Sequence, residues 1–316
     1  TFGERMAIWG KKNYERFDVV HDNQTLAYGL IKLRDMGVPV VGTIHHPITM
    51  DKRIDIKHAE TLSLKLLKWR WYNFLKMQIK VARRLDPIIV VSENTRKDVV
   101  KDFKIDPKKT RKVLHGIDHK TFEPIPSIER KKNQLITTAS ADVPLKGLIY
   151  LIRAYSELLN EFPDLSLVVI GRLRDGPTSN ELDKKDIKNK VKFISDLTSR
   201  EIAELYAEST IAISPSVYEG FGFPAGEAMS CGIPLISTNG GSLPEVVGNS
   251  GIIVPHSNPN ELRKAIKELL LSPEKRKELG EKGRKRVLEK FTWKRAAKEL
   301  VEVYREAISN ADNRSR

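Results

Sequence analysis

Short apolar runs alternate along this chain with longer stretches in which apolar residues recur every three or four positions. The short runs predict buried β-strands, and the longer stretches predict amphipathic helices. In the first part of the chain we expect strands at 18–21, 38–45 and 87–92 and helices at 24–36, 54–85 and 93–103. Alternation of this kind is typical of parallel sheets that are covered by helices on both faces.

A second series follows a stretch with two prolines at 122–127, which predicts a linker between domains. We expect its strands at 134–139, 165–170, 191–194, 211–214, 235–237 and 251–254 and its helices at 147–162, 260–271, 273–290 and 293–308. The chain is therefore predicted to be an α/β protein with two domains, at 1–125 and 126–291, each with a parallel sheet.

The segment from Glu219 to Glu227 reads Glu-Gly-Phe-Gly-Phe-Pro-Ala-Gly-Glu and joins an apolar strand to a short helix that stops before Gly232. Gly220 and Gly222 let the loop backbone approach a ligand closely. The unpaired N–H groups at the helix start favour an anion. A carboxylate on either side of them accepts hydrogen bonds from vicinal hydroxyls. The pattern fits a nucleotide-sugar, which carries both a diphosphate and sugar hydroxyls.

The run at 216–236, Ser-Val-Tyr-Glu-Gly-Phe-Gly-Phe-Pro-Ala-Gly-Glu-Ala-Met-Ser-Cys-Gly-Ile-Pro-Leu-Ile, resembles the signature of glycosyltransferase family 4, retaining enzymes of the GT-B fold. In that family two glutamates with seven residues between them flank the donor, and Glu219 and Glu227 stand at that separation. The resemblance continues at 91–92, 115–124, 146–147, 191–194, 239–247 and 251–255. It implies two Rossmann-like domains whose parallel sheets face a cleft, and a last helix within 292–316 that crosses back to the first domain.

The resemblance also implies roles for individual donor-site residues. Glu227 would accept hydrogen bonds from the ribose hydroxyls, and Glu219 would be a catalytic residue in contact with the transferred sugar. The backbone N–H groups of Gly222 and Phe223 would hold sugar hydroxyls or phosphate oxygens. For Glu227 a structural alternative exists, because the helix dipole favours a glutamate in the first turn of any helix.

Lys146 lies between the strand at 134–139 and the next helix, where a cation reaches a diphosphate at the strand ends. A lone lysine there is usually a solvated surface residue, and the family position favours donor binding instead. The family usually adds an arginine five residues earlier, and Ala141 stands at that place. Arg172, after the strand at 165–170, is the candidate for a second donor-binding cation.

His45 ends the strand at 38–45 and matches the Thr-x-His of the family, whose histidine faces the sugar and the acceptor. His21 and His46 are its neighbours in the same pattern. A histidine at a strand end is more often structural than catalytic. Its motif position makes His45 the catalytic candidate among the three.

Family chemistry is retaining transfer without a metal ion, in which Lys146 and helix N–H groups stabilise the leaving diphosphate. The chain has no Asp-x-Asp motif and no Cys/His cluster with zinc spacing, so we expect no metal and no cofactor besides the donor. The leading prediction is an enzyme that moves a hexose from a UDP- or GDP-sugar to a glycan or lipid-linked hydroxyl. A GT-B phosphorylase, a sugar-phosphate synthase and a nucleotide-binding module without catalysis are the alternatives.

The 316 residues include 55 Lys and Arg against 41 Asp and Glu, a formal net charge of +14. Nothing in the chain resembles a base-reading helix, a stacking sheet or a zinc finger, so we expect no nucleic-acid partner. The single cysteine, Cys231, excludes an internal disulfide. No apolar run approaches the roughly 20 residues of a membrane span, and no signal-peptide core is present. We therefore expect a cytoplasmic protein.

Residues 61–85 carry seven Lys or Arg, no Asp or Glu, and four aromatic residues. Leu64, Leu67, Trp71 and Leu75 fall on one helical face. One interpretation is a core-facing helix with a solvated basic side. The other is a peripheral contact with an anionic membrane, at its inner face, that brings the enzyme to a lipid-linked acceptor.

One departure from the family pattern concerns the N-terminal part. A complete GT-B first domain opens with a strand, a glycine-rich loop and a helix, and nothing before 18–21 corresponds to them. We therefore expect an incomplete first domain. The absent loop normally borders the acceptor and the donor phosphates, so its absence is expected to limit the activity of this chain alone.

Overall fold

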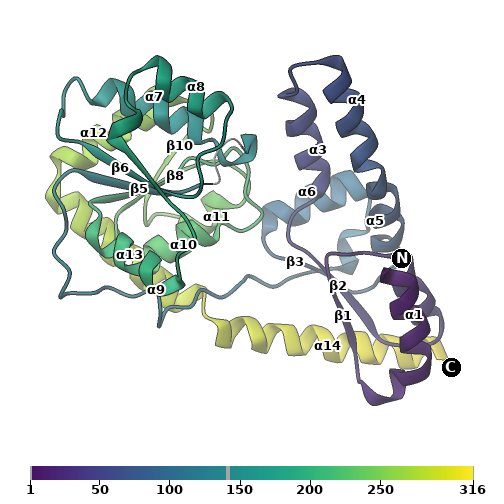
Figure 1. Cartoon of the computed structure of the whole chain (residues 1–316). Coiled ribbons are helices and arrows are strands. Elements are labelled where there is room, and N and C mark those ends of the chain that lie inside the picture. The colour runs from purple at the N-terminus through teal and green to yellow at the C-terminus, as the bar shows by residue number, and fades with distance from the viewer. Residues whose placement is uncertain (1, 140–142, 316) are drawn as a thin grey trace. The chain divides into compact units, whose positions relative to one another are not determined.

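The computed structural model describes residues 2–139 and 143–315, and the chain divides into two compact units (Figure 1). Unit 1 comprises the first 115 residues together with the C-terminal segment that begins at Lys294. Unit 2 is Gly116–Trp293. That the sequence-based limits 1–125, 126–291 and 292–316 mark separately folding domains stays a prediction.

Unit 1 is built on a sheet of four parallel strands in the order β1-β2-β3-β4. The strands are β1 (Val20–Asn23), β2 (Val40–Ile44), β3 (Ile88–Val90) and β4 (Thr110–Lys112). Every residue of β2 and β3 is buried, as is usual for central strands that are covered on both faces. Such strands leave uninterrupted apolar runs in the sequence, which is why these two were predictable.

Helices cover both faces of this sheet. They are α1 (Phe2–Asn13), α2 (Tyr28–Asp35), α3 (Ile48–Lys57), α4 (Leu62–Trp71), α5 (Leu75–Ala82), α6 (Glu93–Phe103) and α14 (Trp293–Ser315). On one face Leu33 of α2, Leu85 after α5 and Phe103 of α6 pack into a common core with the strands. On the other face Val303 and Ala307 of α14 pack against β2 and β3. The C-terminal helix therefore completes the core of unit 1 from Lys294 onward.

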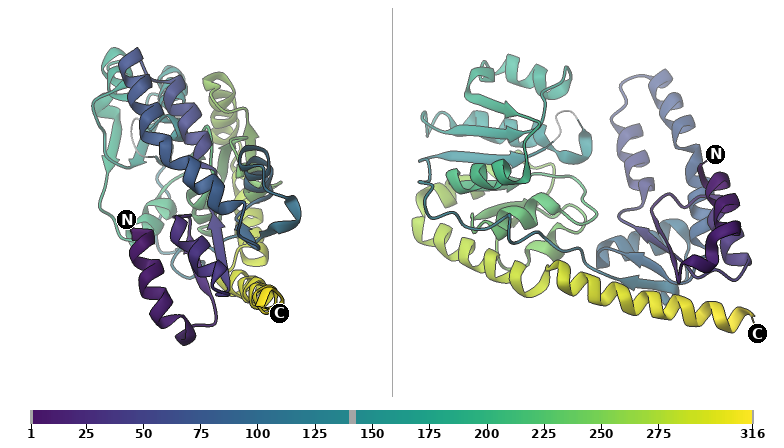
Figure 2. Two further views of the ribbon diagram at one scale, coloured as in Figure 1. Left: turned by 90° about the vertical axis from the view of Figure 1, so that its right-hand side faces the viewer. Right: turned by 60° about the horizontal axis from the view of Figure 1, so that its bottom comes forward.

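The helical stretch expected at 54–85 is wrong as a single element. The structure divides it into α3, α4, a 3₁₀ turn at Tyr72–Phe74 and α5. The break falls at 58–61, where the Thr61 side chain accepts a hydrogen bond from the Leu64 N–H at 3.2 Å and caps the start of α4. As a result α3 and α4 lie side by side as a helical hairpin (Figures 1 and 2).

Unit 2 is built on six parallel strands in the order β10-β9-β8-β5-β6-β7. Their bounds are β5 (Gln134–Thr138), β6 (Ser166–Ile170), β7 (Val191–Ile194), β8 (Ile211–Ser214), β9 (Leu235–Thr238) and β10 (Ile252–Val254). Two parallel sheets, each in its own α/β unit, confirm the predicted fold class. The chain leaves β5 in one direction along the sheet to β6 and β7, and later returns on the other side to β8, β9 and β10.

The helices of unit 2 form a layer on each face of its sheet (Figure 2). The first layer contains α7 (Leu148–Leu158), α8 (Pro177–Lys184) and α12 (Pro259–Leu271), which share one hydrophobic core with the strands. The second contains α9 (Ser199–Glu208), α10 (Phe223–Ser230) and α13 (Pro273–Lys290), which contact β5, β8 and β9. The short α11 (Leu243–Val247) follows β9.

Candidate active site

The loops after β5 and β8 meet at the point where the strand order of unit 2 reverses. These two strands are neighbours, with Leu135 opposite Ile211 and Ile136 opposite Ala212. In open α/β sheets, ligands bind outside the carboxyl ends of the strands at such a switch point. The loop after β5 contains Lys146 and the loop after β8 contains Glu219. Topology therefore brings two of the predicted site residues to one edge of the sheet.

Lys146 and Glu219 are in direct contact. The Nζ atom of Lys146 lies 2.7 Å from Oε1 of Glu219, and the Ser216 hydroxyl donates to the same oxygen at 2.8 Å. The Glu219 side chain is 13% exposed, and the Lys146 side chain is 30% exposed. The ammonium group is thus held at the strand ends by a largely buried carboxylate, with solvent still able to reach it.

Three glycines allow the loop backbones to pack this closely. A Cβ on Gly147 would lie 2.2 Å from the carbonyl oxygen of Pro215, and φ at this residue is +64°. A Cβ on Gly241 would lie 2.2 Å from the carbonyl oxygen of Glu219. The third, Gly240, meets the carbonyl of Ser216 in the same way, at 2.4 Å. Each distance excludes a side chain, so the loops after β5, β8 and β9 are fixed against one another.

Helix α10 begins at the glycine-bearing loop. Gly222 precedes it with φ of +100°, a conformation that favours glycine, and Pro224 occupies its first turn. The Tyr206 hydroxyl lies 3.1 Å from Thr138 Oγ1 at the end of β5 and 3.3 Å from the Pro224 carbonyl. Tyr206 therefore ties the start of α10 to β5. Phe223 is the first residue of the helix and follows the loop that contains Glu219.

Glu227 lies in the second turn of α10 with its carboxyl group partly buried. Burial raises the pKa of Glu227 to about 7. Within the described residues, no hydrogen bond or ion pair to its carboxyl group is present. Burial raises the pKa of the nearby Cys231 thiol, and the negative charge of Glu227 raises it further. A carboxylate without a protein partner is a strong acceptor for a ligand that brings hydroxyl donors.

The second donor-binding cation is not among the residues that the structure brings together here. Arg172 follows β6, is 67% exposed, and pairs with Asp196 at 2.5 Å and with Ser195 at 3.1 Å. Its contacts are therefore on the β7 side, away from Glu219. Ala141 lies outside the described residues. A donor-binding role for Arg172 stays a prediction.

In unit 1, His45 follows β2 and is joined to His115. Its Nδ1 lies 3.0 Å from Nε2 of His115, and its Nε2 lies 2.5 Å from Oδ1 of Asn23. With the Asn23 oxygen as acceptor, His45 carries its proton on Nε2 and accepts the His115 proton at Nδ1. Burial lowers the pKa of both histidines, to about 4 for His115. Both rings are therefore neutral at pH 7, and both nitrogens of His45 are occupied.

The other two histidines of the pattern have separate partners. His21 lies 2.7 Å from Thr43 Oγ1 and 2.7 Å from the Tyr304 hydroxyl of α14. His46 pairs with Asp51 at 2.9 Å. These contacts hold β1, β2, α3 and α14 together. They account structurally for His21 and His46.

Three residues of the site, Ser216, Ser242 and His115, were not predicted from the sequence. The Ser242 hydroxyl donates to the carbonyls of Glu219 and Phe221 at 3.0 and 2.8 Å, so it fixes the glycine-bearing loop from the side of β9. Ser216 and His115 were both inside runs that matched the family pattern. No local signal marks them, because each acts on a residue that is close only in the fold or across a turn.

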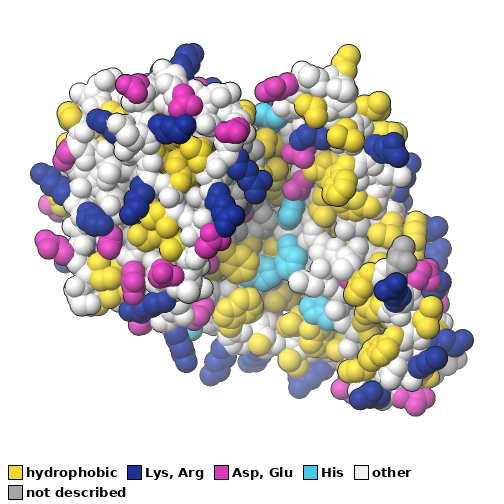
Figure 3. All heavy atoms as spheres, viewed as in Figure 1, with side chains coloured by type: hydrophobic (Ala, Val, Ile, Leu, Met, Phe, Trp, Pro, Cys, Tyr) yellow, Lys and Arg dark blue, Asp and Glu magenta, His cyan; other side chains and the backbone are white. Residues whose placement is uncertain are grey.

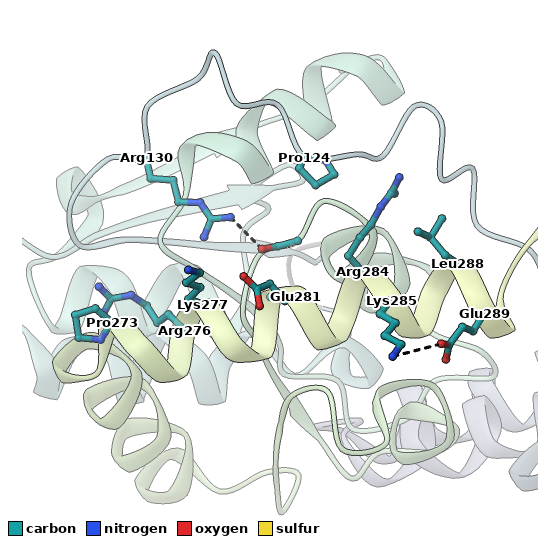
Figure 4. Close-up of a pocket in the computed structure, with 12 residues that line it drawn as sticks. Pro124, Arg130, Pro273, Arg276, Lys277, Glu281, Arg284, Lys285, Leu288 and Glu289 are labelled. Atoms are coloured by element: carbon teal, nitrogen blue, oxygen red, sulfur yellow. Dashed lines mark hydrogen bonds and ion pairs between the residues drawn. The ribbon is translucent and has the colours of Figure 1, made fainter.

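A cavity of about 670 Å³ lies along α13, away from these loops (Figure 4). Arg130 points to the Gly232 carbonyl at 3.0 Å, and Arg284 donates to the carbonyls of Phe122 and Ser230 at 2.9 Å. Arg276 donates to the Leu270 carbonyl at 2.8 Å. The carbonyls of Ser230, Gly232 and Leu270 lie at the ends of α10 and α12, so helix capping explains these contacts. The Phe122 carbonyl belongs to the segment that links β4 to β5.

Within 2–139 and 143–315, no group of three or more His, Cys, Asp or Glu side chains is arranged to hold a metal ion. In the same part of the chain, no helix combines the length and hydrophobicity that a bilayer span requires.

The family comparison covers nearly the whole chain. Residues 2–121 match the model described as Glycosyltransferase Family 4, and residues 120–286 match the one described as Glycosyl transferases group 1. The chain is 40% identical over 297 residues to the MMP alpha-(1->4)-mannosyltransferase of Mycolicibacterium hassiacum. That alignment spans 93% of this chain and 71% of the relative. The comparisons do not support the expected absence of an N-terminal portion.

Solved structures agree on the fold. The UDP complex of Anabaena HepE matches with a TM-score of 0.77 at 18% identity, over 96% of this chain and 82% of that one. The sucrose-phosphate synthase of Thermosynechococcus elongatus matches with a TM-score of 0.76 at 21% identity, over 98% of this chain and 78% of that one. At these identities the likeness establishes the fold alone.

Proposed function

We propose that this chain, which belongs to glycosyltransferase family 4 and is a glycosyltransferase with a GT-B-like fold, moves a hexose from a nucleotide-diphosphate sugar to a glycan or lipid-linked hydroxyl with retention. The observation that carries the proposal is the meeting of Lys146, Glu219 and the start of α10 at the switch point of the unit 2 sheet. A cation and helix N–H groups suit a diphosphate there, and the carboxylate suits sugar hydroxyls.

The donor binds to unit 2 in this proposal. Glu227 accepts the ribose hydroxyls, because its buried carboxyl group has the acceptor capacity that two adjacent hydroxyls need. The diphosphate lies against Lys146 and the N–H groups of Gly222 and Phe223. Glu219 faces the transferred sugar. Arg172 would have to leave Asp196 to serve as a second cation.

In the transfer step, the bond between the anomeric carbon and the diphosphate oxygen breaks, and a bond from the acceptor oxygen forms on the same face. The acceptor proton passes to a phosphate oxygen of the leaving nucleotide. Lys146 and the N–H groups stabilise the charge that develops on the diphosphate, in the place that Mg²⁺ takes in other transferases. For His45 to act as a catalytic residue, its Nε2 atom must contact a substrate in place of Asn23.

Thermal unfolding with UDP, GDP, ADP and their sugars, with Glu227→Gln alongside, tests the donor site. A ligand at 100 times its Kd stabilises the folded state by about 2.7 kcal/mol, so one nucleotide should raise Tm clearly in the wild type and much less in the variant. The relative named above makes mannose and an α-(1→4) linkage the first sugar and linkage to test. A wild-type Tm that none of the nucleotides moves would contradict the proposal.

Product analysis separates the neighbouring reactions. Transfer to an oligosaccharide that is unaffected by EDTA supports the metal-independent transferase. Dependence on orthophosphate would instead identify a phosphorylase, and a requirement for a sugar phosphate as acceptor would identify a synthase. Nucleotide binding without any turnover would leave the chain a binding module.

A further inference from the structure

Helix α4 leaves its large apolar side chains in solvent. None of its ten residues is buried. Leu62 is 84% exposed, Trp71 73% and Leu66 67%. The exposed apolar residues of this helix are Leu62, Leu64, Leu66, Leu67, Trp69 and Trp71. Six exposed leucine and tryptophan side chains on one ten-residue helix mark an interaction site.

The apolar side chains of α4 form two stripes on opposite sides of the helix. Leu62, Leu66 and Trp69 follow the spacing of one helical side, and Leu64, Leu67 and Trp71 follow that of another. Helix α3 contacts the helix between them, since Lys68 pairs with Asp55 at 3.4 Å and Lys52 lies 5.9 Å from the Trp69 ring. This packing still leaves both stripes largely exposed, and Figure 3 shows hydrophobic side chains gathered over the hairpin with Lys and Arg among them.

The charge around these stripes is positive. Residues 61–85 hold no acidic side chain. Lys65 and Arg70 are exposed, and the described part of the chain gives neither an ion-pair partner. The carboxylates of α3 are engaged within the hairpin and its base, Asp55 by Lys68 and Tyr72, and Asp51 by His46. Glu60, in the turn between the helices, is the exposed exception.

We propose that α4 docks on the surface of an anionic lipid bilayer. The stripe of Leu62, Leu66 and Trp69 enters the boundary between headgroups and acyl chains. Lys65 and Arg70, which flank this stripe on the helix surface, bind lipid phosphates. Lysine is depleted at the cores of protein–protein interfaces, so a protein partner fits this mixture less well. The inference stands on unit 1 alone and does not rest on the proposed transfer reaction.

Vesicle flotation at low salt tests the surface. The protein is mixed either with vesicles of equal parts phosphatidylglycerol and phosphatidylcholine or with pure phosphatidylcholine vesicles. We expect it to float with the anionic vesicles, to float much less with the zwitterionic ones, and to be released as salt is raised. Brominated lipid in the anionic vesicles should quench the fluorescence of Trp69.

Variants separate the two contributions. Leu62→Ser with Leu66→Ser removes two apolar side chains of that stripe that are already in solvent, so folding should be unaffected and flotation lost. Lys65→Gln with Arg70→Gln should weaken binding on the order of tenfold or more, since each cation adds about fivefold near an anionic surface. The matched control is Lys294→Gln with Lys298→Gln, two exposed cations of α14 with the same total charge change.

Several outcomes would overturn the proposal. They are failure to float with anionic vesicles, flotation that survives Leu62→Ser with Leu66→Ser, and equal loss in the α14 control, which would show attraction by net charge alone. A lipid-free dimer that the same apolar variant dissociates would assign the surface to a second copy. Glu227→Gln should float like the wild type, so failure here and failure of the donor site are distinguishable.

Discussion

Lys146 Nζ lies 2.7 Å from Glu219 Oε1, and the two residues come from the loops after β5 and β8. In the ligand-free protein the cation proposed for the diphosphate is therefore already occupied by the carboxylate proposed for the sugar. A donor that brings its own negative charge must share Lys146 with Glu219. This competition gives the two residues opposite effects on nucleotide binding.

Glu219→Gln should keep the hydrogen bonds to Lys146 and Ser216 in part while removing the charge. We expect a nucleoside diphosphate to bind a few times more tightly, because Lys146 no longer has an ionic partner to lose. Sugar transfer should fall about 100-fold or more, as when a group that stabilises transition-state charge is removed. Calorimetry measures the affinity for the nucleoside diphosphate, and initial rates measure sugar transfer. Unchanged turnover would contradict the proposed role of Glu219.

Lys146→Met is the reciprocal change. It should weaken nucleoside diphosphate binding by roughly 10- to 100-fold, since a charge-assisted hydrogen bond is lost at the phosphates. It also leaves the largely buried Glu219 carboxylate with the Ser216 hydroxyl, so the free energy of unfolding should fall by about 1–3 kcal/mol. Arg172→Met serves as the comparison. Equal losses of affinity in both variants would show that Arg172 leaves Asp196 to bind the donor.

The burial of Glu227 predicts a specific dependence on pH. Its pKa is about 7 in the folded protein against an ordinary value of 4.5, so between these values the folded state holds the extra proton and this group makes stability fall as pH rises. Glu227→Gln should therefore raise the free energy of unfolding at pH 8 by about 1–3 kcal/mol. Urea unfolding at pH 5 and pH 8 measures the difference.

The same group should couple nucleotide binding to proton release. Ribose hydroxyls donate to the ionised carboxylate, so binding should tighten as pH rises from 6 to 8 and should release a proton near pH 7. Calorimetry in buffers of different ionisation enthalpy detects that proton. Glu227→Gln should abolish both effects, and a pH-independent wild-type affinity would contradict this account of Glu227.

Sequence patterns predicted the strands that are buried on both faces, because such strands leave uninterrupted apolar runs. They missed β4, an edge strand in which Thr110 is the buried residue and no apolar run exists. They also joined α3, α4 and α5 into one element. The apolar residues that favoured a continuous helix there, such as Trp71, are exposed on α4.

The candidate site was predictable where its residues share one loop and unpredictable where the fold pairs distant loops. Glu219 and Glu227 flank one glycine-bearing turn. The contact of Lys146 with Glu219, and that of His45 with His115, each need a particular strand order that neither local segment encodes. The family resemblance indicated site residues after the strands. It did not indicate that Lys146 would contact Glu219 or that His45 would contact His115.

The histidine pair should make unit 1 sensitive to acid. His115 has a pKa of about 4 in the folded protein, so between that value and its ordinary 6.5 the unfolded chain binds the extra proton and stability is lost as pH falls. His115→Asn should reduce the difference in free energy of unfolding between pH 7.5 and pH 5 by about 1–2 kcal/mol. The exposed His256→Asn is the control. An equal reduction in that control would exclude the burial of His115 as the cause.

Gly147→Ala tests whether the close approach of Gly147 to the Pro215 carbonyl positions Lys146. The new Cβ would meet the Pro215 carbonyl oxygen at 2.2 Å in a residue with φ of +64°. Gly232 has nearly the same φ, +68°, but the nearest atom to its Cβ would be 3.4 Å away. Gly232→Ala should therefore cost about 1–2 kcal/mol from the left-handed backbone alone.

Gly147→Ala must also push the loops after β5 and β8 apart, so we expect a loss about 1–3 kcal/mol larger than in Gly232→Ala. The separated loops should no longer hold Lys146 against Glu219, and nucleotide affinity should fall in Gly147→Ala while Gly232→Ala binds like the wild type. Urea unfolding and calorimetry on both variants test the two parts. Equal destabilisation, or unaltered affinity in Gly147→Ala, would show that the loop contact does not position the cation.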